Sequence, residues 1–114
     1  MIWFHCIILT MKPTKEHILE YLHELKNELH HEGIVQLGLF GSSARGENTI
    51  YSDIDVAIKK EESYLKHRNA YAYFEEVAKI KRLIFEKFRR SSDVFDLDSN
   101  SSMKDSILKD VIYV

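Results

Sequence analysis

The chain has 114 residues, enough for one compact domain with a modest core but too few for a catalytic domain plus a separate substrate-binding domain. Its formal net charge of −2 provides no overall basic field for gripping a nucleic-acid backbone, which weighs against a self-sufficient polymerase. The single cysteine, Cys6, excludes an internal disulfide and fits a reducing cytosol. We therefore expect a cytoplasmic protein in which Cys6 is an inert side chain.

The first ten residues are the most unusual segment. Residues 2–9 are almost entirely apolar, but this run is too short to span a bilayer. It also lacks the charged start and the small-residue cleavage site of a signal peptide, so we expect no membrane association. We interpret residues 1–10 as an extension ahead of an alternative start at Met11, and residues 11–114 as the folded domain. The alternative is an added edge strand or a segment that faces a partner.

Apolar spacing predicts a helix over residues 14–31, with Thr14 as its N-cap and Gly33 at its end. A buried strand is expected over residues 34–40, before a glycine-rich loop. Residues 53–60 are expected to form a second strand. Side-chain alternation divides that strand between two faces of the sheet: Ile54, Val56 and Ile58 on one, and Asp53, Asp55 and Ala57 on the other.

The second half of the sequence predicts a long helix over residues 64–90, a third strand over residues 93–97, and a last helix over residues 102–111 capped by Ser101 or Ser102. The order of elements indicates a small α/β (α+β) domain with one mixed sheet. One broad face of the long helix is expected to be core: Tyr71, Phe74, Val77, Ile84 and Phe88. The aromatic residues at this helical spacing, Tyr64, Tyr73 and Phe85 among them, favour core over a base-stacking platform.

Histidine spacing gives no metal site. His23 and His30 share a face of the first predicted helix, but no third ligand has a matching position. Known zinc patterns need such a ligand. We therefore expect these two imidazoles to be solvated.

The loop over residues 41–46, with the sequence GSSARG, has the composition of a phosphate-binding turn. A strand that leads into a glycine-rich turn presents unpaired backbone N–H groups, to which anions bind. Gly41 lets a phosphate approach the backbone, and Gly46 relieves the exit turn. Hydroxyl donors and a positive charge come from Ser42, Ser43 and Arg45.

Asp53 and Asp55 lie two residues apart on a predicted strand, so their side chains point the same way. Their carboxylates repel each other unless a cation lies between them. Mg²⁺ prefers oxygen ligands and takes substrate phosphates and waters as its remaining partners. With the preceding loop, this pair indicates an enzyme that handles a nucleoside triphosphate.

Gly41-Ser42, ten residues, and then Asp53-Ile54-Asp55 resemble the signature of the polymerase-beta-like nucleotidyltransferase superfamily. The sequence around both motifs is similar to its smallest branch, the minimal nucleotidyltransferases. The motifs cover residues 39–58, whereas the length and the element order match from Met11 to the C-terminus. The resemblance implies a polymerase-beta-like nucleotidyltransferase fold.

The resemblance also implies roles for particular residues. The nucleotide phosphates would be held by Gly41, Ser42, Ser43, Arg45, Gly46 and Ser52. Asp53 and Asp55 would hold the catalytic metal ions. A third carboxylate from a later strand would complete the metal site and assist deprotonation of the attacking hydroxyl. The candidates are Asp93, Asp96 and Asp98. We favour Asp93, because an apolar pair follows it and its distance to the last predicted helix resembles the family's arrangement. Asp96, on the other face of the strand, is the alternative, since this run can be read in either register.

The implied reaction is attack of a hydroxyl on the α-phosphate of a nucleoside triphosphate, ATP by resemblance, with two Mg²⁺ ions. Since the chain has no second domain, the acceptor is expected to come with another chain. Minimal nucleotidyltransferases are typically encoded beside a helical HEPN protein, and in characterised pairs they are antitoxins that adenylylate a tyrosine of that toxin. The alternatives are a subunit that modifies a small molecule such as an aminoglycoside, and a non-catalytic antitoxin that acts by occlusion. No direct grip on nucleic acid is expected.

Overall fold

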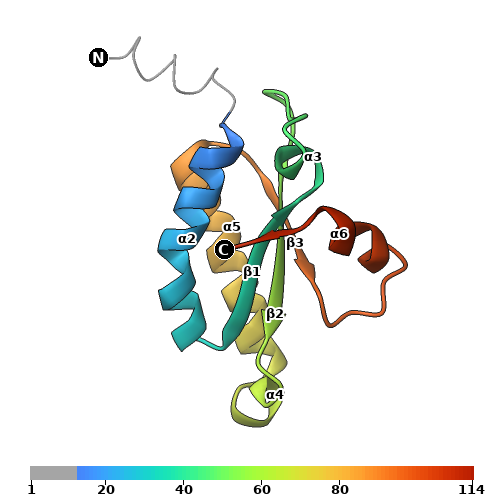
Figure 1. Ribbon diagram of the computed structural model, residues 1–114. Coiled ribbons are helices and arrows are strands. Elements are labelled where there is room, and N and C mark those ends of the chain that lie inside the picture. Colours follow the sequence, from blue (N-terminus) through green and yellow to red (C-terminus); the bar gives the residue numbers. More distant parts are fainter. Residues whose placement is uncertain (1–12) are drawn as a thin grey trace.

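The computed structural model describes residues 13–114 (Figure 1). The predictions for Cys6 and for residues 1–10 lie outside this range. The described elements are α2 (Lys15–His31), β1 (Ile34–Phe40), α3 (Gly41–Ala44), β2 (Ile54–Lys60), α4 (Tyr64–His67), α5 (Ala70–Phe88), β3 (Ser92–Asp96), α6 (Lys104–Asp110) and β4 (Ile112–Tyr113). No helix within this part of the chain has both the length and the apolar character needed to cross a membrane.

Four strands form one mixed sheet in the order β3-β2-β1-β4. Strand β1 pairs antiparallel with β2 and with β4, whereas β2 and β3 are parallel. The parallel pair requires a crossover, and helix α5 supplies it. The predicted mixed sheet and the α+β class are therefore confirmed.

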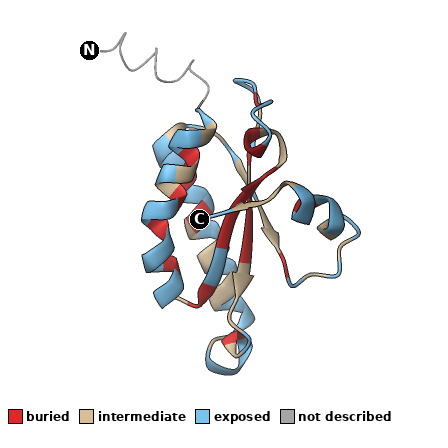
Figure 2. Cartoon of the chain, in the orientation of Figure 1, coloured by how far each residue is buried: buried red, intermediate tan, exposed pale blue. Residues whose placement is uncertain are grey.

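The sheet is covered by helices on both faces. Helices α2 and α5 lie together on one face, and the short α6 lies on the other (Figure 1). The larger core lies under α2 and α5, and includes Ile54, Val56 and Ile58 of β2. A smaller core lies under α6, where Phe40, Ala57, Leu97 and Ile107 meet. Figure 2 shows the buried positions concentrated in the central strands.

The first half of the domain follows the sequence predictions closely. The Thr14 side chain caps α2 by accepting a hydrogen bond from the His17 backbone N–H at 3.1 Å. Gly33 follows the helix with a φ of 95°, which is a backbone conformation that suits glycine. The alternation predicted for β2 is confirmed, because its isoleucines and valine enter the larger core and Ala57 enters the smaller one.

The single helix predicted over residues 64–90 is wrong, because the chain breaks between α4 and α5. Arg68 is extended, and its guanidinium donates to Glu61 Oε1 at 3.0 Å and to the His31 backbone oxygen at 3.3 Å. Asn69 then caps α5, since its Oδ1 accepts a hydrogen bond from the Ala72 N–H at 2.8 Å. A good N-cap residue inside an apolar pattern thus starts a new helix.

The predicted core face of α5 is only partly correct. Ile80 and Ile84 are buried, and Tyr73, Val77 and Phe88 are half-buried. By contrast Tyr71, Phe74 and Phe85 are exposed by 70%, 67% and 48%. The restart of the helix at Asn69 makes Ile80 and Ile84 the centre of the buried face, which leaves these three rings toward solvent. His23 and His30 are exposed, as expected.

Two corrections concern the C-terminal region. Strand β3 and helix α6 begin and end within two residues of the predicted limits. The cap position of α6 is Met103, not a serine, although the Ser101 hydroxyl accepts a hydrogen bond from the Met103 N–H at 3.1 Å. Strand β4 was not predicted, because its two residues gain a strand conformation only by pairing with Gly38 and Leu39 of β1.

Candidate active site

Two of the predicted site aspartates lie side by side at one end of the sheet. In the parallel pairing of β2 with β3, Asp55 is the direct partner of Asp93. On its other side Asp55 is paired with Phe40, the last residue of β1. Paired residues in a sheet send their side chains to the same face. The register therefore brings two carboxylates together where β1 runs into the turn of α3.

A cleft of about 440 Å³ opens over this end of the sheet, between the turn of α3 and helix α6. One wall carries Gly41, Ser42 and Arg45, and the floor carries Asp55 and Asp93. The remaining lining residues come from β1, β3 and α6: Phe40, Val94, Phe95, Met103, Ser106, Ile107 and Asp110. The cleft thus has a polar end with carboxylates and an apolar end under α6.

Gly41 is required at the start of this turn for two reasons. Its φ is 73°, in the left-handed region that side chains rarely adopt. A Cβ atom at this position would also collide with the carboxylate of Asp55. The glycine therefore lets the turn of α3 lie directly against the aspartate pair, which places the predicted phosphate-binding backbone beside the predicted metal ligands.

The Asp55 carboxyl is harder to ionise than a carboxyl in water. Burial raises the pKa of the Asp55 carboxyl, the neighbouring Asp93 and Asp53 carboxylates raise it further, and the Arg45 guanidinium lowers it. Among the lining residues in the described part of the chain, Arg45 is the only base. It is already paired with two other carboxylates, Glu47 at 3.0 Å and Asp110 at 2.6 Å. Among the described lining residues, the only cation near the aspartate pair is therefore bonded to other carboxylates.

This donor set suits a hard divalent cation, because all of its ligands are oxygens and the ion would remove their mutual repulsion. The carboxylates are not gathered into a ready coordination sphere, however. Within residues 13–114, no group of three or more His, Cys, Asp or Glu side chains has the geometry to hold a metal ion. Substrate phosphates would have to supply the missing ligands.

Several predicted site residues do not line the cleft. Asp53 is exposed just before β2, where its charge still acts on Asp55. Ser43 is 1% exposed, and its hydroxyl has no hydrogen-bond partner within residues 13–114. The Ser52 hydroxyl accepts a hydrogen bond from the Thr49 N–H at 2.8 Å and so helps to build the turn before β2. Gly46 follows the α3 turn with a φ of 72°.

The alternative third carboxylate, Asp96, lies on the opposite face of the sheet. It pairs with Ile58 in the register, and its Oδ2 accepts a hydrogen bond from Lys60 Nζ at 2.8 Å. Burial alone raises the pKa of Asp96, but its bond to the Lys60 ammonium holds the net value below the usual range. The structure thus places Asp93 beside Asp55 and gives Asp96 a different partner.

Sequence reasoning missed the contribution of α6. Met103, Ser106 and Asp110 come from a helix expected only to close the fold, yet they form one wall of the cleft. The short apolar pattern of this helix indicates which side is buried. No motif indicates that its other residues face the aspartates.

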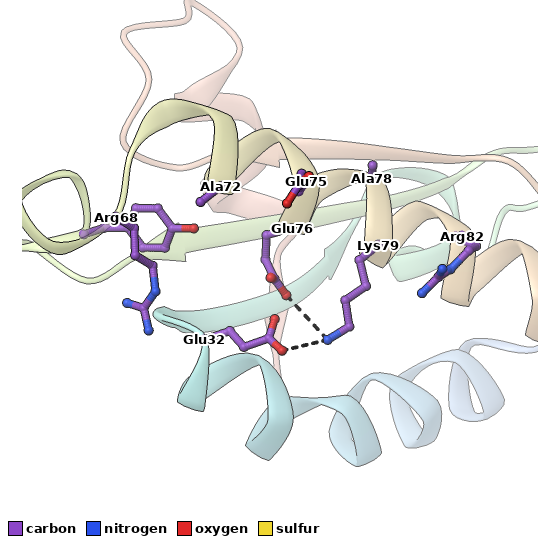
Figure 3. Close-up of a pocket in the computed structure, with 9 residues that line it drawn as sticks. Glu32, Arg68, Ala72, Glu75, Glu76, Ala78, Lys79 and Arg82 are labelled. Atoms are coloured by element: carbon purple, nitrogen blue, oxygen red, sulfur yellow. Dashed lines mark hydrogen bonds and ion pairs between the residues drawn. The ribbon is translucent and has the colours of Figure 1, made fainter.

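A groove of about 600 Å³ lies on the other face of the molecule, between α2 and α5 (Figure 3). Its lining includes Glu32, Glu76 and Lys79, whose side chains converge in Figure 3. Lys79 Nζ lies 2.9 Å from Glu32 Oε1, 2.8 Å from Glu28 Oε1 and 4.0 Å from Glu76 Oε1. The cation of this acidic cluster thus contacts the carboxylates around it directly.

The family model for polymerase beta nucleotidyltransferases matches residues 11–114. The chain therefore belongs to this nucleotidyltransferase family, as the glycine-serine turn and the paired aspartates predicted. A comparison with curated proteins finds no significant match.

Solved structures share the fold. One, described as a minimal nucleotidyltransferase, gives a TM-score of 0.68 at 21% identity and covers 88% of this chain and 95% of its own. A toxin–antitoxin structure with AMP-PNP gives 0.53 at 19% identity, over 77% of this chain and 70% of that one. A mutant of the toxin–antitoxin MntA–HpeT gives 0.50 at 16% identity, with the same coverage of 77% and 70%. The domain thus has the polymerase-beta-like fold, with toxin–antitoxin proteins among its structural neighbours.

Proposed function

We propose that this protein is a metal-dependent protein adenylyltransferase. It would move AMP from ATP to a hydroxyl of a partner protein, as an antitoxin that adenylylates a tyrosine of a HEPN toxin. The observation that carries the proposal is the pairing of Asp55 with Asp93 directly beside the Gly41 turn. Membership of the nucleotidyltransferase family and the toxin–antitoxin neighbours, one of them with AMP-PNP, support it.

The residues of the cleft have distinct parts in this reaction. Backbone N–H groups at Gly41 and Ser42 would hold the triphosphate. Asp53, Asp55 and Asp93 would hold up to two Mg²⁺ ions, which would supply charge neutralisation at the attacking and leaving oxygens. The protein's own contribution is mainly positioning, because phosphoryl transfer requires little covalent chemistry from side chains.

The proposed step conserves atoms and charge. The acceptor hydroxyl oxygen forms a bond to the α-phosphorus, and the bond from that phosphorus to the bridging oxygen of the β-phosphate breaks. Pyrophosphate leaves with the bonding electron pair. Asp93 would accept the hydroxyl proton, because it is exposed and lies on the edge strand β3.

The form of the cleft supports an acceptor carried by another chain. The cleft is bounded by short elements of this one domain, and its volume of about 440 Å³ is modest for a triphosphate and an acceptor together. An aromatic hydroxyl presented from outside would meet Asp93 on the exposed edge strand. The apolar residues under α6 offer packing for a ring, whether of the base or of the acceptor.

The test is an intact-mass measurement on the helical protein encoded by the neighbouring reading frame. It is incubated with this protein, ATP and MgCl₂, and in parallel with CTP, GTP or UTP. A gain of one or more adenylyl groups, mapped to a tyrosine, is the expected result. Asp55→Asn should abolish the gain, whereas Asp105→Asn, an exposed site on α6 outside the cleft, should leave it unchanged.

Two results would contradict the proposal. A stable complex with no mass gain from any nucleotide would indicate neutralisation by occlusion. Transfer to an added aminoglycoside but not to the protein partner would indicate a small-molecule nucleotidyltransferase.

A further inference from the structure

Arg45 is held at two edges of its guanidinium by carboxylates from different parts of the chain. Its Nε donates to Glu47 Oε2 at 3.0 Å, and its Nη1 donates to Asp110 Oδ2 at 2.6 Å. Glu47 is a near neighbour in sequence, but Asp110 is 65 positions away. Two acceptors on different nitrogens fix the plane of a guanidinium, whereas a single acceptor leaves it free to swing.

This clamp, in which Glu47 and Asp110 hold the Arg45 guanidinium, contributes little to the stability of the fold. The side chains of Arg45 and Glu47 are 44% and 65% exposed, and that of Asp110 is 29% exposed. Ion pairs so open to solvent contribute little to stability, because water screens them and ordering the side chains costs entropy. Asp110 is also the last residue of α6, where the negative end of the helix dipole disfavours an acid.

The location of the clamp indicates a different use. Arg45 and Asp110 both line the cleft that contains Gly41, Ser42, Asp55 and Asp93. Arg45 is the only basic side chain among its lining residues in the described part of the chain. A guanidinium has five N–H donors. Within residues 13–114 the two bonds to Glu47 and Asp110 are its only recorded partners, which leaves three donors for a ligand.

We propose that Asp110 is a positioning residue that aims Arg45 at the pyrophosphate portion of a bound nucleoside triphosphate. The proposal rests on the nucleotidyl-transfer function above. The reacting α-phosphate would lie beside Asp55 and Asp93. Arg45 follows the turn of α3 on the wall of the cleft, so its remaining N–H donors would reach the β- and γ-phosphates. Helix α6 would thus help to bind the pyrophosphate leaving group, because its Asp110 orients Arg45.

The test compares binding of a non-hydrolysable ATP analogue with binding of AMP, by calorimetry in MgCl₂. Asp110→Asn should weaken binding of the analogue about tenfold, the effect of one oriented charge contact, and leave AMP affinity unchanged. In an Arg45→Ala background, Asp110→Asn should cause no further loss. Asp110→Glu, which restores a carboxylate, should recover most of the affinity. Asp105→Asn on the same helix is the matched control.

Each contrary outcome is distinct. Tighter binding of the analogue by Asp110→Asn would mean that Asp110 competes with phosphate for Arg45, and would overturn the proposal. Equal losses for the analogue and AMP, or additive losses with Arg45→Ala, would assign Asp110 a general structural role and overturn it as well. Failure of the unmodified protein to bind any nucleotide would overturn the proposed function, and this inference with it.

Discussion

The cleft and the groove between α2 and α5 both contain neighbouring carboxylates, but they differ in how the negative charge is balanced. In the groove, Lys79 lies within 2.9 Å of both Glu28 and Glu32 and within 4.0 Å of Glu76 (Figure 3). In the cleft, Asp55 and Asp93 are adjacent in the sheet, and Arg45, the one base among the described lining residues, is already paired twice.

The pKa directions follow this difference. Burial, together with the neighbouring Glu32 carboxyl, raises the pKa of Glu76 to about 7, whereas Glu76 and the bond to Lys79 lower the pKa of Glu32. The ammonium of Lys79 lies among these carboxyls and balances part of their charge. Burial and two like charges raise the pKa of Asp55, and the charge of Arg45, which is bonded to other carboxylates, offsets only part of this rise. The acidic cluster of the groove thus has a counter-charge in direct contact, whereas the aspartates of the cleft do not, which is the arrangement expected for the proposed binding of a cation and phosphates.

The largest expected effect separates Asp93 from Asp96. Asp93→Asn should reduce nucleotidyl transfer by about 10²–10³-fold, the range for loss of one group that stabilises developing charge, with no loss of thermal stability. Asp96→Asn should instead lower the free energy of unfolding by about 1–2 kcal/mol, because Lys60 loses its closest partner, and leave the rate per folded molecule unchanged. Transfer assays and denaturant melts of both variants are compared. The reverse assignment would hold if Asp96→Asn lost the activity.

A smaller effect is expected in the groove. Lys79→Ala removes the cation from three carboxylates and should lower the free energy of unfolding by about 1–2 kcal/mol at pH 7.5. Activity per folded molecule should not change, since the groove lies on the other face of the sheet. Lys81→Ala, at an exposed position of the same helix, is the matched control and should have little effect. Urea denaturation measures both, and equal results for the two variants would contradict the role assigned to Lys79.

The smallest effect concerns pH. The pKa of Glu76 rises from 4.5 to about 7 on folding, so its contribution to stability is full below pH 4.5 and is lost as the pH rises through 7. Glu32, with a lowered pKa, acts oppositely in more acidic solution. Glu76→Gln should therefore be within about 1 kcal/mol of the unmodified protein at pH 5 and exceed it by more than about 1 kcal/mol at pH 8.

Urea melts at both pH values test this prediction, with Glu75→Gln as an exposed control on the same helix. A parallel loss of stability by Glu76→Gln at pH 5 and pH 8 would show that Glu76 does not hold a proton in the folded state.

Local sequence determined the first half of the fold. The alternation of Ile54, Val56 and Ile58 fixed which face of β2 is buried, and therefore that Asp55 points to the other face. Thr14 fixed the start of α2. The turn at Gly41, followed by two aspartates, was enough to predict the family. These features depend on hydrogen bonds and side-chain periodicity over a few residues, which a sequence displays directly.

Only the tertiary structure decided which later residues lie beside Asp55 and Arg45. Asp93 and Asp96 both fit a short strand, and the parallel register of β3 against β2 placed Asp93 beside Asp55. Strand β4 exists because β1 offers an edge to it. Asp110 meets Arg45 because α6 folds over the smaller core. Such contacts join residues far apart in the chain, and their geometry follows from strand pairing and packing, for which no local pattern carries a signal.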